Sequence, residues 1–145
     1  MSEALYTRDI LRLAVSIPYQ RRLEGPDGSA EQRSRACGSV VAADVILADD
    51  ETLAQLGWTI NACALGQASA AILGIEAVGL SASDILKARS RLADFLNGKA
   101  DSPGHWQNMD KLAAARDHQG RHGAILLPYD TLIAAFADAA KREAA

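Results

Sequence analysis

Residues 38–60, GSVVAADVILADDETLAQLGWTI, contain two runs of alternating residues on either side of a short acidic segment, Asp49-Asp50-Glu51. Alternation with a period of two is typical of strands that bury one face. The residues expected on the buried side are all apolar: Val41, Ala43, Val45, Leu47, Ala54, Leu56, Trp58 and Ile60. This stretch predicts an antiparallel hairpin with Asp44 on its opposite face. Because a hairpin alone is marginally stable, we expect helices to cover the apolar face.

Helical spacing is found on both sides of this hairpin. Apolar residues within 4–15 predict a first helix, which Pro18 limits. After the hairpin, apolar side chains recur every three or four residues and predict a core helix over 64–78: Leu65, Ala68, Ile72, Ile75 and Val78. Residues 16–36 are polar and rich in turn-forming residues, so we expect a surface loop there.

Three further helical segments are expected in the second half of the chain. Ser81-Ala82-Ser83-Asp84 is a capped helix start, and Asn97-Gly98 ends that helix. A short helical piece is expected over 109–115, and the last helix is expected to begin near Pro128. The order of helix, hairpin and helices predicts an α+β domain, occupying residues 1–145 as one unit.

Composition excludes several classes of protein. The 145 residues are 49% hydrophobic and 23% charged, as in an ordinary globular domain and unlike a disordered chain. The net charge of −3 argues against binding to nucleic acid. The N-terminus has no basic region followed by an apolar core, and no run approaches the roughly 18 apolar residues that span a bilayer. We therefore expect a cytoplasmic protein without a membrane partner.

The chain has two cysteines, Cys37 and Cys63, which are too few for a disulfide scaffold or a four-cysteine zinc site. Cys37 precedes the first strand of the hairpin, and Cys63 follows the second at the start of the core helix. A hairpin brings these two points to the same end, and a helix N-terminus stabilises a thiolate. The pair is therefore a candidate metal or catalytic site, although a cysteine is also simply a small buried hydrophobe.

The three histidines are not equally good candidates for a metal ligand or a catalytic residue. His105 lies in a loop beside Trp106, and Gly120 weakens a helical metal face formed by His118 and His122. His122 alone is the better candidate, because it lies shortly before the last helix. No dinucleotide, nucleotide, zinc-protease or serine-hydrolase motif is present, so the sequence does not predict an enzyme.

The segments around the cysteines resemble the scaffold family for iron–sulfur cluster assembly, the IscU type and the N-terminal domain of NifU. The family has its first cysteine in N-P-x-C-G-D, where this chain has Ser34-Arg35-Ala36-Cys37-Gly38-Ser39. The second stands in G-C-A-I-S-x-A-S-A, and residues 62–70 read ACALGQASA. Residues 121–126, RHGAIL, resemble the region of the third cysteine. Gly123 replaces that third cysteine, Ser39 replaces the aspartate, and the family's L-P-P-V-K segment has no counterpart before His122.

The resemblance implies a fold, a cargo and partners. The fold is a small antiparallel sheet of about three strands with helices on one face. The cargo is iron or a labile [2Fe–2S] cluster held by Cys37, Cys63 and His122, with water, Ser39 or a small thiol as fourth ligand. Zinc in a Cys2His site, with Ser39 or water fourth, is the alternative metal. The implied partners are a cysteine desulfurase and apo iron–sulfur acceptor proteins, and the chain is expected to be a monomer or weak homo-oligomer.

Two other functions stay open at this point. The loss of the third cysteine and of the aspartate is also expected of a diverged, non-assembling relative that acts as a partner-binding or regulatory module. A small thiol enzyme would use Cys63 as nucleophile and His122 as base, but no carboxylate in the sequence is placed to orient the base.

Overall fold

The predicted hairpin consists of strands β2 (Val40–Leu47) and β3 (Leu53–Asn61) in the computed structural model, which describes residues 5–35 and 37–145. The strands are antiparallel, with Val40 opposite Asn61 and Ala43 opposite Trp58. A register irregularity at Ile46 and Leu47 turns Leu53 into the core and leaves Ala54 exposed, so the inward position predicted for Ala54 is wrong.

A third strand lies within the segment predicted to be a loop. Residues 28–33 form β1 (Gly28–Arg33), which pairs antiparallel with β2 and gives the sheet order β1-β2-β3. The sequence of β1, GSAEQR, has almost no apolar residues because it is an edge strand, so hydrophobic alternation could not identify it. The prediction of a loop is therefore wrong for these six residues, while a small antiparallel sheet in an α+β fold is confirmed.

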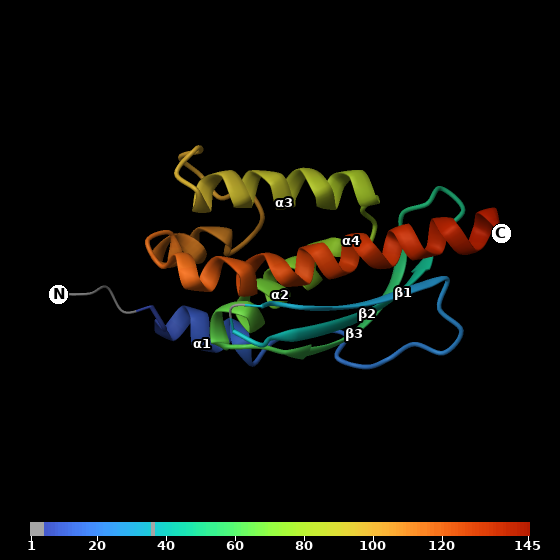
Figure 1. Ribbon diagram of the computed structural model, residues 1–145, viewed down its shortest axis with the longest axis horizontal. Helices are drawn as coiled ribbons and strands as arrows, with labels where there is room; N and C mark the ends of the chain where they lie inside the picture. Colours follow the sequence, from blue (N-terminus) through green and yellow to red (C-terminus); the bar gives the residue numbers. More distant parts are fainter. Residues whose placement is uncertain (1–4, 36) are drawn as a thin grey trace.

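Helices cover one face of this sheet in layers (Figure 1). Helix α4 (His122–Ala144) runs along β1 and β2, α2 (Ala64–Ala77) packs beside it, and α3 (Ala82–Leu96) lies on the far side of α4. Helix α1 (Arg8–Ala14) packs on α2. Two 3₁₀ helices, η1 (Met109–Ala115) and η2 (Gln119–Arg121), lead into α4.

Helices α2 and α3 begin where the sequence predicts them to begin. Cys63 is the N-cap of α2, and α3 begins with a capping box in which Ser81 and Asp84 bond each other's backbone N–H groups. Ile75 and Val78, predicted to lie in the core, are instead 51% and 42% exposed. Helix α1 begins at Arg8; the predicted start at residue 4 lies outside the described residues.

Helix α4 begins six residues before the predicted start, so that Pro128 lies inside it. Proline has no N–H to donate to the carbonyl four residues earlier, which normally breaks a helix. Here the opened turn lies against α2, where the Ser69 hydroxyl donates a 2.6 Å hydrogen bond to the Ile125 carbonyl. The carbonyl that loses its helical donor is that of Ala124, and the Ser69 bond to the next carbonyl holds this turn on α2, so the helix continues through the proline.

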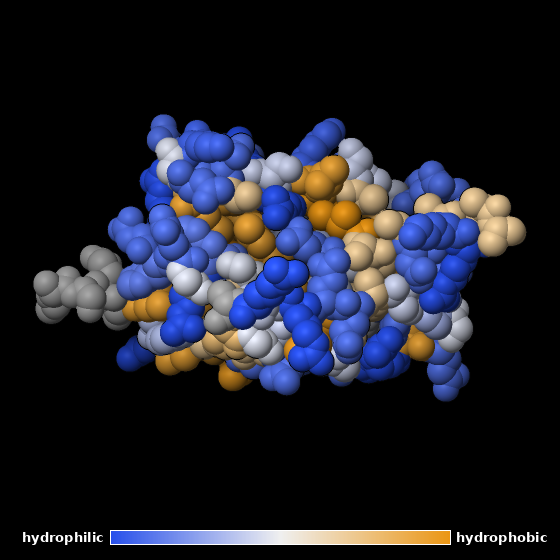
Figure 2. Space-filling model, viewed as in Figure 1, coloured by the Kyte–Doolittle hydropathy of each residue, from blue (hydrophilic) through white to orange (hydrophobic). Residues whose placement is uncertain are grey.

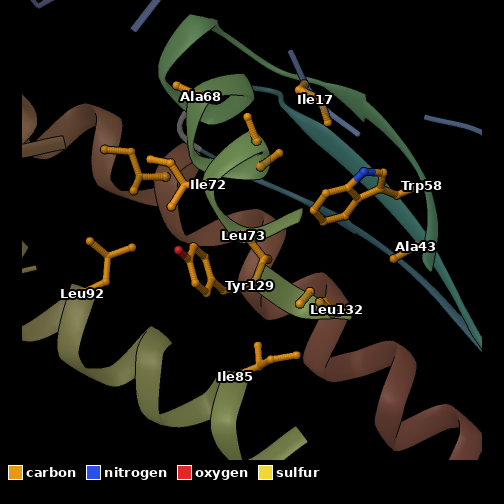
Figure 3. Close-up of a cluster of buried hydrophobic side chains, with 14 of the residues drawn as sticks. Ile17, Ala43, Trp58, Ala68, Ile72, Leu73, Ile85, Leu92, Tyr129 and Leu132 are labelled. Carbon is orange, nitrogen blue, oxygen red and sulfur yellow. The ribbon is translucent and has the colours of Figure 1, made fainter. Parts of the chain in front are cut away.

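The core lies between the sheet, α2, α3 and α4. Figure 3 shows Tyr129 and Leu132 of α4 between Leu73 of α2 and Ile85 of α3, with Trp58 of β3 on the sheet side. On the view of Figure 2, apolar atoms come to the surface mainly in the furrow between α3 and α4, and most of the remaining face is hydrophilic. The core thus lies within three layers, which are the sheet, α4 with α2 beside it, and α3.

Helix α4 also has the apolar character of a membrane span. Among the described residues, the helical segment Gln119–Ala144 is long and apolar enough to cross a bilayer by length and composition. This differs from the prediction that no segment comes near that length. In the fold, 56% of the apolar 18-residue stretch within this segment is buried, and α4 packs on β1, β2, α2 and α3. The apolar side of α4 is therefore accounted for by the core.

The opposite face of the sheet carries an ion pair in which the carboxylate is buried and the guanidinium of Arg22 is partly exposed. The Asp44 side chain is 2% exposed, and it accepts hydrogen bonds from the Arg22 guanidinium at 2.7 and 2.8 Å, from the Ser29 hydroxyl and from the Leu23 N–H. The Arg22 guanidinium, against the opposing effect of burial, lowers the pKa of Asp44 from 3.8 to about 2. These hydrogen bonds hold residues 22–23 against β2 on the face of the sheet opposite the helices.

We expect Asp44→Asn to destabilise the protein by about 2 kcal/mol above pH 4, because the amide cannot replace the charge-assisted bonds. A lowered carboxyl pKa stabilises the fold above the unfolded value of 3.8, and this contribution is lost as the pH falls through about 2. Urea denaturation of the wild type and the variant at several pH values measures the difference. Asp49→Asn, an exposed change of the same charge, is the control, and equal losses in both variants would contradict the assignment.

Candidate functional site

Three chain segments meet at one end of the sheet, at the left of Figure 1: the turn between β1 and β2, the N-terminus of α2 and the N-terminus of α4. The pairing of Val40 with Asn61 brings the turn and the start of α2 to the same end. A Cβ on Gly66 would lie 3.2 Å from the Ala124 carbonyl oxygen, so α2 and α4 touch backbone to backbone. The absence of a side chain at Gly66 is what permits this approach.

Cys37 lies in the turn between β1 and β2. Its Sγ is 2.9 Å from the hydroxyl of Ser39, and the thiol is partly exposed. Burial opposes ionisation of the thiol, but hydrogen bonds from the Ser34 hydroxyl and from the Ser39 hydroxyl and N–H, with the charge of Arg121, lower the pKa of Cys37 below its usual 9.0. Cys37 is therefore a partly exposed thiol with a lowered pKa, and it lies beside two buried serines.

Cys63 occupies the N-cap position of α2. Its side chain caps none of the helix N–H groups, while its carbonyl accepts the first helical bond from the N–H of Gln67 at 2.9 Å. The thiol is partly exposed, as the Cys37 thiol is. Cys63 therefore lies at a helix start whose first N–H groups have no hydrogen bond from the N-cap side chain.

His122 is the first residue of α4, and its ring is held by backbone. Nε2 lies 3.1 Å from the Ala115 carbonyl oxygen and 3.0 Å from the Arg116 carbonyl oxygen. Carbonyls only accept hydrogen bonds, so Nε2 carries the proton. In the neutral ring, the lone pair is therefore on Nδ1, as in metal-binding histidines whose other nitrogen is bonded to a carbonyl.

Gly123, at the position of the family's third cysteine, faces the Cys37 turn. A Cβ at Gly123 would lie 3.1 Å from the Ser34 hydroxyl oxygen, with no other atom within 4 Å among those compared. The position that lacks a thiol is thus next to a serine that bonds Cys37. Ser34 and Arg121 were not predicted as site residues. The only signal in the sequence was the closeness of Ser34 to Cys37 and of Arg121 to His122.

The other candidates lie elsewhere. His105 is in the loop before η1, and His118 precedes η2, so that His118 and His122 share no helix face. Within residues 5–35 and 37–145, no three Cys, His, Asp or Glu side chains are grouped closely enough to hold a metal ion. The structure therefore brings Cys37, Ser39, Ser34 and Gly123 together and places Cys63 and His122 on the two helix starts at the same end, without closing them into one ligand set.

Comparison with solved structures gives the class of protein to which this fold corresponds. The N-terminal structure of a nitrogen-fixing NifU-like protein from Brucella abortus superposes with a TM-score of 0.88 and 26% identity, over 94% of this chain and 95% of that one. An iron–sulfur cluster assembly scaffold protein of the SUF system from Fervidobacterium islandicum, so named with the qualifier putative, superposes with a TM-score of 0.82 and 18% identity, over 91% and 96%. No family model and no curated protein matches the sequence.

These neighbours confirm the resemblance read from the cysteine segments. The chain has the NifU-like N-terminal fold, and the structural neighbours support an IscU/NifU-type family for it. The fold class and the family resemblance are therefore both confirmed, while the roles of Cys37, Cys63, His122 and Ser39 stay predictions.

The Cys37 turn leads to a test on the protein alone. Ser39→Ala removes the hydroxyl hydrogen bond that favours the Cys37 thiolate and keeps the bond from the residue 39 N–H, so we expect the pKa of Cys37 to rise and its alkylation by iodoacetamide to slow at pH values below 9.0. Mass spectrometry of the Cys37 peptide follows the reaction against pH. Ser90→Ala, on the exposed side of α3, is the control, and a pH profile shared by all three proteins would contradict the proposed stabilisation.

Proposed function

We propose that the protein is an iron–sulfur cluster assembly scaffold and not an enzyme, and that iron or a labile [2Fe–2S] cluster is its cargo. One observation carries the proposal: the likeness to the NifU-like protein of Brucella abortus extends over 94% of the chain at 26% identity. The placement of the cysteines supports it, because Cys37 lies in the turn between β1 and β2 and Cys63 at the start of α2, both at the end of the sheet where α4 begins.

The proposed ligands are Cys37 Sγ, Cys63 Sγ and His122 Nδ1. Thiolates are the usual protein ligands of a [2Fe–2S] cluster, and histidine is an accepted substitute. The lowered pKa of Cys37 increases the share of the thiolate, which is the form that binds metal. The hydrogen bond from Nε2 of His122 to backbone carbonyls presents Nδ1 as the free nitrogen.

The start of α2 supplies favourable electrostatics for such a cargo. Its N-cap residue, Cys63, caps none of the helix N–H groups with its side chain, whereas α4 continues from η2 and the His122 N–H donates to the Gln119 carbonyl. The N–H groups and the positive end of α2 favour nearby negative charge, and the thiolate and sulfide ligands of iron are negatively charged. Arg121 adds a cation at the same end.

The fourth position on the cargo is left to a weak or external ligand. The Ser39 hydroxyl, water or a small thiol are the ligands weighed from the sequence, and the structure adds the Ser34 hydroxyl beside Gly123. An oxygen or exchangeable ligand binds iron less firmly than a thiolate, so the cluster is expected to be labile. Lability suits transfer to another protein more than storage.

The partners proposed on this basis are a cysteine desulfurase, which supplies sulfur, and apo iron–sulfur proteins, which accept the cluster. The proposed setting is the cytoplasm, where thiols stay reduced, and the proposed state is a monomer or weak homo-oligomer. Zinc in a Cys2His site stays a prediction with no support from the structural neighbours.

Anaerobic reconstitution with ferrous iron and sulfide tests the proposal. We expect stoichiometric iron and sulfide with visible charge-transfer absorption in the wild type, and loss of both in Cys63→Ala and in Cys37→Ala. His122→Ala is expected to weaken retention several-fold, while His118→Ala, its matched control, retains the cluster. Wild-type protein that takes up no iron, or a Cys63→Ala variant that keeps all of it, would contradict the scaffold assignment.

Gly123 favours a second candidate, a non-assembling relative that binds partners without building clusters. In the IscU type, the cysteine at the position of Gly123 looks like the residue that accepts sulfur from the desulfurase. A pull-down with a cysteine desulfurase separates the two functions. Binding of the desulfurase with no sulfur transfer to Cys37 or Cys63 and no cluster would favour the partner-binding module over the scaffold.

Gly123→Cys is predicted to strengthen binding of the cargo. The added Cβ meets only the Ser34 hydroxyl, the movable end of a small side chain, so the variant is expected to fold. A thiolate in place of an exchangeable ligand should slow loss of iron to a chelator by about tenfold or more, as a gain of at least 1.4 kcal/mol. Gly123→Ser is the control for size, and equal chelation rates in wild type and Gly123→Cys would refute the placement of the fourth ligand.

A further inference from the structure

A second hollow lies away from the cysteines, between α3 and the loop that leads into η1. It encloses about 350 Å³, within the range of pockets for small ligands. One wall is a single stripe of α3 with helical spacing: Asp84, Lys87, Ala88 and Arg91. The other wall is formed by residues 104–109, and Leu80 closes one end. We call this hollow the α3 groove.

The lining of the α3 groove includes an aromatic ring in a fixed orientation. Trp106 stacks on the buried ring of Tyr129, with centroids 6.1 Å apart and planes 13° from parallel. Trp106 is half-buried, and Met109 beside it is 1% exposed. Tryptophan, methionine, leucine and alanine together present an apolar surface suited to a flat hydrophobic group.

The charges that line the α3 groove are mostly positive in a protein whose net charge is −3. Lys87 and Arg91 lie one helical turn apart, and His105 lines the opposite wall. Within the part of the chain that the structure describes, none of these three side chains is in an ion pair or a side-chain hydrogen bond. The one carboxylate, Asp84, already accepts bonds from the Ser81 N–H and hydroxyl at 3.0 Å.

We propose that the α3 groove binds a small organic anion with a flat apolar body. The carboxylate, sulfonate or phosphate of the ligand pairs with Lys87 and Arg91, and its apolar body lies against Trp106 and Met109. An apolar surface alone would accept any hydrophobic group, and cations alone would accept any anion. Their combination in one hollow selects a ligand that has both features.

The probe for the test is anilinonaphthalene sulfonate, an aromatic anion that fluoresces when it leaves water. We expect saturable binding to the full chain at one site, with energy transfer from tryptophan. Benzoate should displace the probe, whereas benzyl alcohol, which lacks the charge, and inorganic phosphate, which lacks the ring, should not at equal concentration. Displacement by benzyl alcohol or by phosphate as effective as that by benzoate would overturn the proposal.

Variants place the binding in the α3 groove. Lys87→Gln with Arg91→Gln should weaken probe binding by about tenfold or more, from the loss of charge-assisted hydrogen bonds. Ala88→Phe, which fills the hollow and leaves both charges, should weaken it as strongly. Lys99→Gln, on an exposed residue outside the groove, should leave binding unchanged. Circular dichroism checks that each variant is folded, and a folded double variant that binds as the wild type does would refute the assignment.

Discussion

The close contact between the first turns of α2 and α4 is the constraint on which the rest of this structure depends. At Gly66 the two helices meet with almost no side chain between them, and one turn further the Ser69 hydroxyl bonds the Ile125 carbonyl. Larger residues at either position would push the helix starts apart. Because Cys63 lies at the start of α2 and His122 at the start of α4, this contact sets how near the candidate ligands lie to one another.

The same contact explains an irregular feature of α4. Pro128 weakens the hydrogen bonding of the turn before it, and that turn is the one that packs on Gly66 and Ser69. The carbonyl that loses its donor is that of Ala124, and the Ser69 hydroxyl bonds the next carbonyl, that of Ile125, so α2 holds the opened turn in place. Helix α4 is thereby able to serve two purposes, as the central layer of the core and as the support of His122.

The hairpin, the core helix and the capped start of α3 could be predicted from sequence because each has a strong local signal: alternation, three-to-four spacing and a Ser81–Asp84 capping box. Strand β1 could not, because an edge strand of polar residues has no hydrophobic pattern. The start of α4 was missed because Pro128 is a common first-turn residue, whereas in the fold the turn before it packs on α2, which is far away in sequence. At the site, the cysteines were found by motif and by hairpin geometry. Ser34 could not be found, since its contact with Cys37 depends on the turn.

Gly123 bears on how a cluster would leave the protein, under the proposed function. A scaffold with a full set of thiolates has to release one of them before an acceptor can bind iron, so that exchange is dissociative and slow. Here, within residues 5–35 and 37–145, the one atom that a side chain starting at Gly123 would meet is the Ser34 hydroxyl oxygen, and the position itself supplies no sulfur. An acceptor thiol could approach at that position while Cys37 and Cys63 still hold the cluster, and the transfer would follow an associative course through a mixed-ligand intermediate shared by the two proteins.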